Sequence, residues 1–176
     1  MTTKEILRVN LFPNARCVAS GAKPNSTNAT IDAGVVSGGL TWLRFTIKNH
    51  EQVGPVYFHG LRTVPGETYV FRAKIHANDD TQALIFDMPS QNPLVDIDIK
   101  QMISDYKEAR FTALSDQTSI RFSVPMIEGG YLMLAEPQLE LASTYDAAVA
   151  GGGVFASSPG TPCRDHSGSR RAGGAR

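Results

Sequence analysis

The sequence predicts an all-β protein, an antiparallel jelly-roll β-sandwich followed by a flexible C-terminal tail. Hydrophobic and polar residues alternate along most of the chain, which is typical of strands that bury one face and expose the other. Turns rich in Gly, Pro, Asn and Asp separate some eight short segments of this kind. No regular alternation of strands with helices is visible, which favours a sandwich over a parallel α/β fold.

The first strand is predicted at residues 42–47, where apolar and polar residues alternate: Leu43, Phe45 and Ile47 against Trp42, Arg44 and Thr46. The second covers residues 56–59. The third covers residues 69–76, and its two faces are Tyr69, Phe71, Ala73 and Ile75 against Val70, Arg72, Lys74 and His76.

A turn at Val64-Pro65-Gly66-Glu67 separates the second and third of these strands. Proline presets φ at the second turn position, and glycine accepts the positive φ that a type II turn requires at the third. We predict that the two strands pair across this turn.

Further strands are predicted at residues 82–88, 109–113, 120–124, 131–134 and 138–141, with a turn at 128–130. Residues 96–99 also alternate like a strand. Met102, Ile103 and Tyr106 have a helical spacing, so residues 100–107 are predicted as a short helix or loop.

The length and composition favour one β-sandwich domain at residues 1–145 and a Gly/Ser/Arg-rich tail at residues 146–176. The tail cannot bury enough apolar surface to offset its ordering entropy. We expect it to be disordered unless a partner holds it. Its spaced arginines, at 164, 170, 171 and 176, could bind an acidic surface or nucleic acid, but no aromatic residues lie between them to favour nucleic acid.

Charge and cysteine content exclude several classes of protein. Lys plus Arg and Asp plus Glu each number 17, so no overall field favours nucleic acid. No apolar run is long enough for membrane insertion, and no apolar signal segment starts the chain, which predicts synthesis in a cytoplasm. Cys17 and Cys163 are too few and too far apart for a disulfide framework, so both are predicted to be thiols.

Four segments resemble one protein family. They are Asn10-Leu11-Phe12-Pro13-Asn14-Ala15-Arg16, Val64-Pro65-Gly66-Glu67-Thr68-Tyr69-Val70-Phe71, Glu108-Ala109-Arg110-Phe111-Thr112-Ala113 and Glu136-Pro137-Gln138-Leu139-Glu140-Leu141. Together they are similar to jelly-roll domains, themselves similar to carbohydrate-binding modules, of bacteriophage minor tail proteins. The resemblance spans residues 7–142 and rests on turns and core strands. Ala15 stands where the family usually has proline, and Ala142 where it usually has glycine.

The resemblance implies a non-enzymatic virion structural protein of the phage tail tip, baseplate or fibre, synthesised in the host cytoplasm. Its implied partners are other virion tail proteins, host surface glycans and further copies of itself. The alternative is a carbohydrate-binding module that recognises a glycan through an exposed aromatic and basic face. A third alternative is an enzyme. The sequence offers no nucleophile elbow, phosphate loop or characteristic pair of carboxylates that would support it.

The predicted ligand-binding residues are aromatic or cationic and lie on the predicted polar faces: Trp42, Arg44, Tyr57, His59, Arg72 and Arg121. Trp42 lies opposite the core-facing residues of its strand, so its indole is a candidate platform for a sugar ring. Alternatively, it lies under a loop or in a subunit interface. The arginines and Lys74 are expected to line one sheet surface that suits acidic glycans, or else to form ordinary cross-strand pairs.

No catalytic residue or cofactor is predicted, and the four histidines are too scattered for a transition-metal site. Jelly rolls of the resembled class often hold a structural calcium ion. The resemblance therefore allows a bound calcium ion as the alternative to a protein without a cofactor. The available carboxylate pairs are Asp79 with Asp80 and Asp96 with Asp98. Neither pair follows an ion-binding loop consensus.

Overall fold

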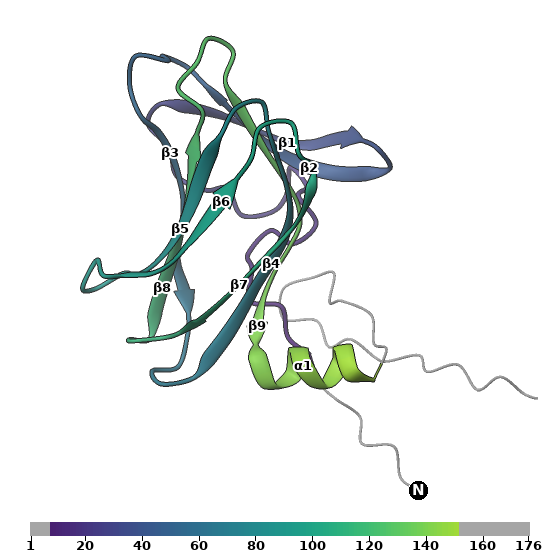
Figure 1. The fold of residues 1–176 in the computed structure, drawn as a ribbon, viewed down its shortest axis with the longest axis vertical. Helices are drawn as coiled ribbons and strands as arrows, with labels where there is room; N and C mark the ends of the chain where they lie inside the picture. Colours follow the sequence, from purple (N-terminus) through teal and green to yellow (C-terminus); the bar gives the residue numbers. More distant parts are fainter. Residues whose placement is uncertain (1–7, 152–176) are drawn as a thin grey trace, which may run out of the picture.

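Two antiparallel sheets packed face to face form most of the molecule in this computed structural model, which describes residues 8–151 (Figure 1). The strands are β1 (Ala29–Ser37), β2 (Leu40–Ile47), β3 (Gly54–Arg62), β4 (Thr68–Ala77), β5 (Thr81–Asp87), β6 (Pro93–Ile99), β7 (Asp105–Thr112), β8 (Gln117–Val124) and β9 (Tyr131–Leu141). One helix, α1 (Ala142–Ala150), follows them. The predicted antiparallel β-sandwich is confirmed.

The five-stranded sheet has the order β1-β2-β9-β4-β7, and the four-stranded sheet has the order β3-β8-β5-β6. Only β1–β2 and β5–β6 are consecutive strands within one sheet; every other connection crosses the sandwich. Because of this crossing pattern, most neighbours within a sheet come from distant parts of the sequence, as in β2–β9, β4–β9 and β3–β8.

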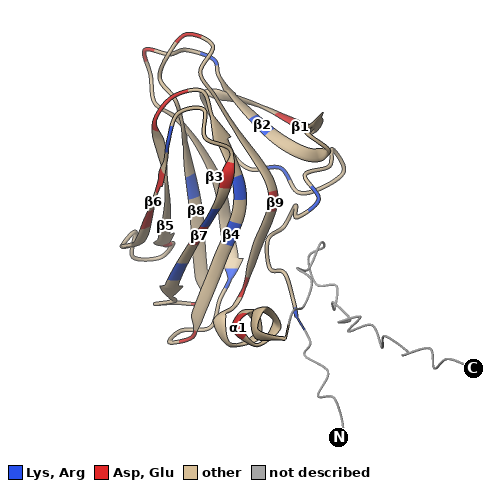
Figure 2. Ribbon diagram, turned by 45° about the vertical axis from the view of Figure 1, so that its right-hand side comes forward, with Lys and Arg blue, Asp and Glu red and all other residues tan. Residues whose placement is uncertain are grey.

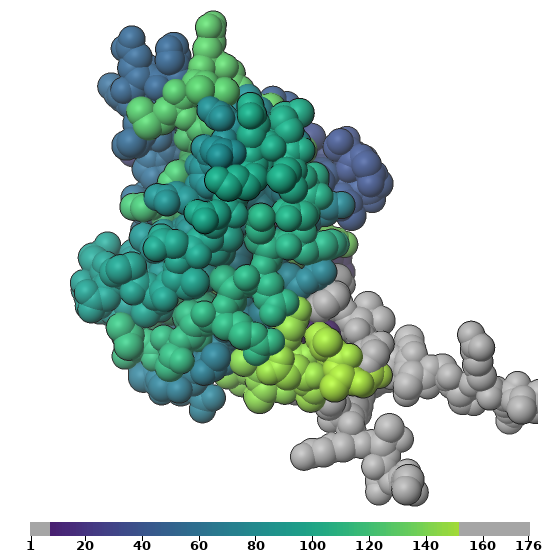
Figure 3. Space-filling view, viewed as in Figure 1, coloured from purple at the N-terminus to yellow at the C-terminus, as the bar shows by residue number. Residues whose placement is uncertain are grey.

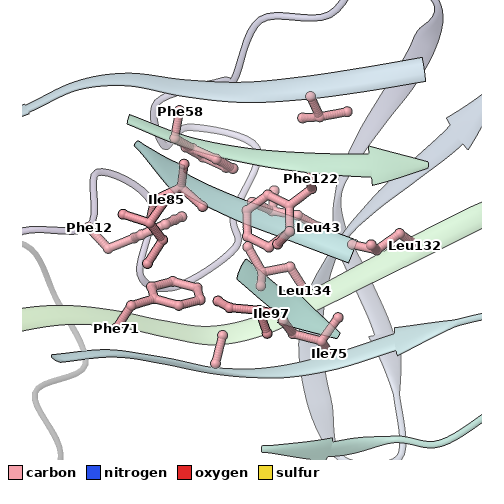
Figure 4. Packing of buried hydrophobic residues seen from close by; sticks show 14 of the residues in the cluster. Phe12, Leu43, Phe58, Phe71, Ile75, Ile85, Ile97, Phe122, Leu132 and Leu134 are labelled. Carbon is pink, nitrogen blue, oxygen red and sulfur yellow. The ribbon is translucent and has the colours of Figure 1, made fainter. Parts of the chain in front are cut away.

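The core lies between the two sheets, where phenylalanines from both sheets and from the N-terminal segment meet (Figure 4). The ring of Phe12 lies 4.5 Å from that of Phe58, and the ring of Phe71 lies 6.2 Å from that of Phe122, measured between centroids. The apolar positions predicted to face the core are buried, as alternation indicated: Leu43, Phe45, Ile47, Tyr69, Phe71, Ala73 and Ile75.

The predicted pairing of residues 56–59 with residues 69–76 is wrong. β3 pairs with β8, and β4 pairs with β7 and β9 in the other sheet. The turn itself forms as expected, because Gly66 has a φ of 84° and the amide of Glu67 donates to the Val64 carbonyl at 3.1 Å. It connects the two sheets instead of closing a hairpin.

Three other elements differ from the sequence prediction. β1 was not predicted, since Gly34 and Ser37 interrupt its pattern. Residues 100–107 form neither the expected helix nor a single loop: a turn with Met102 at a φ of 57° leads directly into β7. The two strands predicted at 131–134 and 138–141 are one strand, β9, with a local irregularity where Glu136 has a φ of 49°.

The predicted domain boundary at residue 145 falls inside α1, so residues 146–150 continue the helix instead of starting the tail. Ala142, Tyr145 and Ala148 are buried, and Tyr145 packs with Val70 of β4. Figure 3 shows the helix against one end of the sandwich. The remainder of the predicted tail, with Cys163 and the four arginines, lies outside the described residues. Between residues 8 and 151, no helix is both long and apolar enough to cross a membrane.

Candidate functional site

The six predicted site residues lie on two opposite outer faces of the sandwich. Tyr57 and His59 of β3 and Arg121 of β8 belong to the four-stranded sheet. Trp42 and Arg44 of β2 and Arg72 of β4 belong to the five-stranded sheet. The expectation that all the basic residues line one surface is therefore wrong for Arg121. Figure 2 shows basic positions on β4 and on β8, in different layers.

The expectation of an exposed indole at Trp42 is also wrong. Alternation places Trp42 on the outer side of its sheet, but its side chain is only 5% exposed. Its Nε1 donates a hydrogen bond to the Ser37 carbonyl at 2.9 Å, which folds the indole back onto the β1–β2 hairpin. Trp42 thus stabilises the hairpin and offers no open ring face to a sugar.

A pocket of about 470 Å³ opens on the outer face of the four-stranded sheet. Because Val56, Phe58 and Phe122 point into the core, their neighbours along β3 and β8 point outward. Tyr57, Arg121, Ser123 and Gln82 thus form the floor, while residues at the start of β3 and in the adjoining loops form apolar walls. The wall residues are Val53, Pro55, Pro125 and Met126.

The Tyr57 ring is held in place by its neighbours. It stacks on the His59 ring with centroids 4.8 Å apart and planes 12° apart. Phe86 meets it edge-on at 6.4 Å, and His59 Nδ1 lies 3.3 Å from the Ser119 hydroxyl. This packing fixes Tyr57 as a rigid part of the pocket floor.

Arg121 stands directly opposite Tyr57 in the register of β3 and β8. Its Nε is shielded and makes no hydrogen bond to any other described residue. Arg121 also forms no ion pair within residues 8–151. The pocket therefore contains a cationic donor group beside an aromatic ring.

Asp80 places an ionised acceptor at the rim of the pocket. The backbone amide of Gln101 donates to Asp80 Oδ1 at 2.7 Å, and Lys100 Nζ lies 3.0 Å from Oδ2. These two contacts, the amide first, hold the pKa of Asp80 below its ordinary value. The carboxylate thus stays charged under neutral conditions.

The carboxylates considered for calcium do not gather into a metal site. Asp80 is engaged by Lys100 and Gln101, while Asp98 stands opposite Gln82 on the outer side of β6. Within the described part of the chain, no three His, Cys, Asp or Glu side chains are arranged to hold an ion.

Sequence reasoning missed four residues that contribute polar groups to the pocket: Asp80, Thr81, Gln82 and Ser123. Gln82 and Ser123 occupy outward positions of strands that alternation does predict. What the sequence did not reveal was the order β3-β8-β5, which brings these positions beside Tyr57.

No family model matches the chain, and no curated protein matches it. Among solved structures it is similar to the enzymatically active domain of bacteriophage CBA120 tailspike protein 4, with a TM-score of 0.56 and 13% identity over 76% of this chain. That match covers 21% of the tailspike chain, so this chain spans about a fifth of its length.

Two smaller domains are also similar. The second N-terminal cellulose-binding domain of Cellulomonas fimi β-1,4-glucanase C has a TM-score of 0.52 and 14% identity, over 76% of this chain and 95% of that one. The CBM1 domain of BiXyn10A has a TM-score of 0.52 and 11% identity, over 80% of this chain and 100% of that one. At these identities the likeness shows a shared jelly-roll fold.

Proposed function

We propose that this protein is a carbohydrate-binding module that holds a glycan in the pocket on the outer face of the four-stranded sheet. One observation carries the proposal: the pocket brings the fixed ring of Tyr57 beside the guanidinium of Arg121, which no carboxylate among residues 8–151 pairs with. A cellulose-binding domain among proteins of the same fold supports it.

The pocket has the groups that sugar recognition needs. A sugar has an apolar face that stacks on an aromatic ring and hydroxyls that both donate and accept hydrogen bonds. Tyr57 supplies the ring, Arg121 donates, and Asp80 accepts. Gln82 and Ser123 supply groups of both kinds. Because Lys100 already compensates Asp80, Arg121 leaves the pocket with one positive charge, which suits a hydroxyl-rich saccharide with or without an acidic group.

The proposal is for binding without hydrolysis. Most glycosidases use two carboxyl groups on opposite sides of the bond that breaks. Asp80 is the one carboxylate among the described residues that line the pocket, and Lys100 and Gln101 already engage it. These contacts favour a fixed acceptor over a general acid.

A second, finer candidate places this module in a phage tail, where it would bind host surface glycans and other tail proteins as a homo-oligomer. The similarity to a phage tailspike domain supports this candidate, together with the four segments that resemble minor tail proteins. Incubation of purified protein with tail proteins expressed from the neighbouring genes would test it. A monomer by light scattering that binds none of them would contradict it.

The glycan proposal is tested on an array of neutral and acidic glycans, followed by calorimetric titration of the best ligand. We expect Tyr57→Ala and Arg121→Gln each to weaken binding at least about tenfold, since each removes a principal contact. Matched controls on surfaces away from the pocket, Tyr106→Ala and Arg16→Gln, should keep the wild-type affinity. Far-UV circular dichroism and thermal unfolding would verify that every variant is folded.

Binding to no glycan would contradict the proposal. Binding that survives both pocket substitutions would place the site elsewhere. Release of reducing sugar during the titration would instead identify a hydrolase.

A further inference from the structure

The outer face of the five-stranded sheet carries a second group of aromatic and basic residues, which we call the Tyr131 cluster: Arg44, His76 and Tyr131. The guanidinium carbon of Arg44 lies 4.5 Å from the centre of the Tyr131 ring. The His76 ring lies 5.8 Å from the same ring, and its Nε2 is 3.3 Å from the tyrosine hydroxyl. The three residues come from the adjacent strands β2, β4 and β9.

Two further cations, Arg72 and Lys74, lie on β4 next to this cluster. The guanidinium carbon of Arg72 is 3.6 Å from the centre of the Tyr106 ring, and Lys74 Nζ is 5.8 Å from it. Tyr106 belongs to β7, the neighbour of β4. We call Arg44, Arg72, Lys74, Tyr106 and Tyr131 together the basic strip.

Two cations of the basic strip are not compensated within the described residues. Arg44 and Lys74 make no ion pair there, and Arg44 Nε has no hydrogen-bond acceptor. Arg44 Nε is itself shielded from solvent, so a partner would have to bind the outer N–H groups of the guanidinium. His76 Nδ1, beside the same Tyr131 ring, has no hydrogen-bond partner in the described part of the chain either.

Acidic residues on this face are mostly engaged by other groups. Glu136 accepts a hydrogen bond from the Tyr106 hydroxyl, Glu140 pairs with Arg8, and Glu108 accepts from Tyr145. Asp32 stands opposite Arg44 in the register but forms no ion pair with it. The tyrosine hydroxyls leave the charges of Glu136 and Glu108 in place, so the basic strip is a local group of three cations, Arg44, Arg72 and Lys74, with carboxylates at its edges.

The chemistry of the strip favours a carboxylate-bearing partner over a sugar. The cations stack on the faces of Tyr131 and Tyr106, so those faces are already covered. A stacked guanidinium still directs in-plane N–H groups outward, and this fork matches a carboxylate. Arg44 on β2 and Lys74 on β4 are separated by β9 and offset by two residues along β4, a span of about 12 Å, which an extended peptide covers in about four residues.

We propose that the basic strip is a docking surface for an acidic, Asp- or Glu-rich segment of a partner protein. This surface lies on the sheet opposite the pocket and does not depend on glycan binding. A partner attached here leaves the pocket open.

The test uses a fluorescein-labelled ten-residue peptide of alternating glutamate and glycine, titrated with the full chain and followed by fluorescence anisotropy. We expect saturable binding that weakens when salt rises from about 50 to 300 mM, because salt screens exposed charges. Lys74→Gln should weaken binding several-fold, and Arg44→Gln with Lys74→Gln at least about tenfold.

Two control variants separate the basic strip from other cations. Arg121→Gln, on the opposite sheet, should leave peptide affinity unchanged. A variant with glutamine at positions 164, 170, 171 and 176 removes the tail arginines and should also retain binding. Lys74→Gln alone, at a partly exposed position, keeps the test valid if the double variant fails to fold.

Three outcomes would overturn the proposal. They are no peptide binding at about 50 mM salt, wild-type affinity in the folded Lys74→Gln variant, and loss of binding in the tail variant. A sulfated polysaccharide that binds through Arg44 and Lys74 where the peptide does not would assign the strip to an acidic glycan instead.

Discussion

Cys17 shows how burial alone sets the chemistry of a residue. Its side chain is fully buried, and Sγ donates to the Leu134 carbonyl at 3.2 Å. Desolvation penalises the thiolate and raises the pKa of Cys17 to about 11. Hence the thiol form stabilises the fold at neutral pH. That contribution is complete below the unfolded pKa of about 8.5 and is lost as pH rises through 11.

We predict that Cys17 resists thiol reagents in the folded protein. At pH 8 a pKa of about 11 leaves roughly 0.1% thiolate, against about a quarter for an ordinary cysteine, and burial blocks access as well. In a Cys163→Ser variant, dithionitrobenzoate should react with Cys17 slowly in buffer and rapidly in 6 M guanidinium chloride. A fast reaction in buffer would show that the core opens locally at Cys17.

The alternating pattern predicts on which side of its strand Trp42 lies but not how exposed its side chain is. The alternating pattern correctly separates Leu43, Phe45 and Ile47, which face the core, from Trp42 on the other side of β2. It says nothing about what covers the outer side of a strand. The hydrogen bond to Ser37 depends on the neighbouring strand β1, which the pattern does not reveal.

The helix α1 is an element that depends on its contacts. It has nine residues, no side-chain cap at its N-terminus and no acidic residue in its first turn. Such a short helix is marginal in isolation. Here Tyr145 donates to Glu108 at 2.5 Å, and Arg110 makes two hydrogen bonds to Asp146 at 2.6 and 3.0 Å. The helix is thereby attached to β7 by side chains.

We predict that Tyr145→Ala destabilises the protein by about 3 kcal/mol, because it removes a large buried ring from between α1 and β4. Tyr145→Phe keeps the ring and should cost only about 1.5 kcal/mol, the lower end for a hydrogen bond to a charged group, because the Glu108 carboxylate is exposed. Urea unfolding followed by circular dichroism measures both. Equal losses in the two variants would assign the stabilisation to the hydroxyl instead of the ring.

The sequence predicts where the strands lie better than it predicts which strands pair with each other. Most strands lie where alternation placed them, because inward and outward positions follow directly from period two. The pairing of β3 with β4 was wrong because a turn with the right residues can either close a hairpin or carry the chain to the other sheet. The pocket was missed for the same reason: Tyr57, Arg121 and Gln82 meet only after β3, β8 and β5 are ordered.

The whole molecule is built mainly from pairings between distant parts of the chain. β2 pairs with β9, and Leu43 lies opposite Leu134. Such a topology closes large loops before its contacts form, which slows folding. We predict refolding in milliseconds to seconds, measured by stopped-flow fluorescence of Trp42. Complete refolding in microseconds would contradict this expectation.

The first described residue lies beside the start of the last element, at one end of the sandwich. Arg8 stacks near the ring of Tyr145, with its guanidinium carbon 5.8 Å from the ring centre, and also binds Glu140 at the end of β9. A circular permutant that joins residue 8 to the end of α1 through a short linker and opens the exposed turn at Gly38-Gly39 would keep every strand pairing. For the same reason, this sandwich suits insertion into a loop of another protein, since it enters and leaves its host at one end of the sandwich.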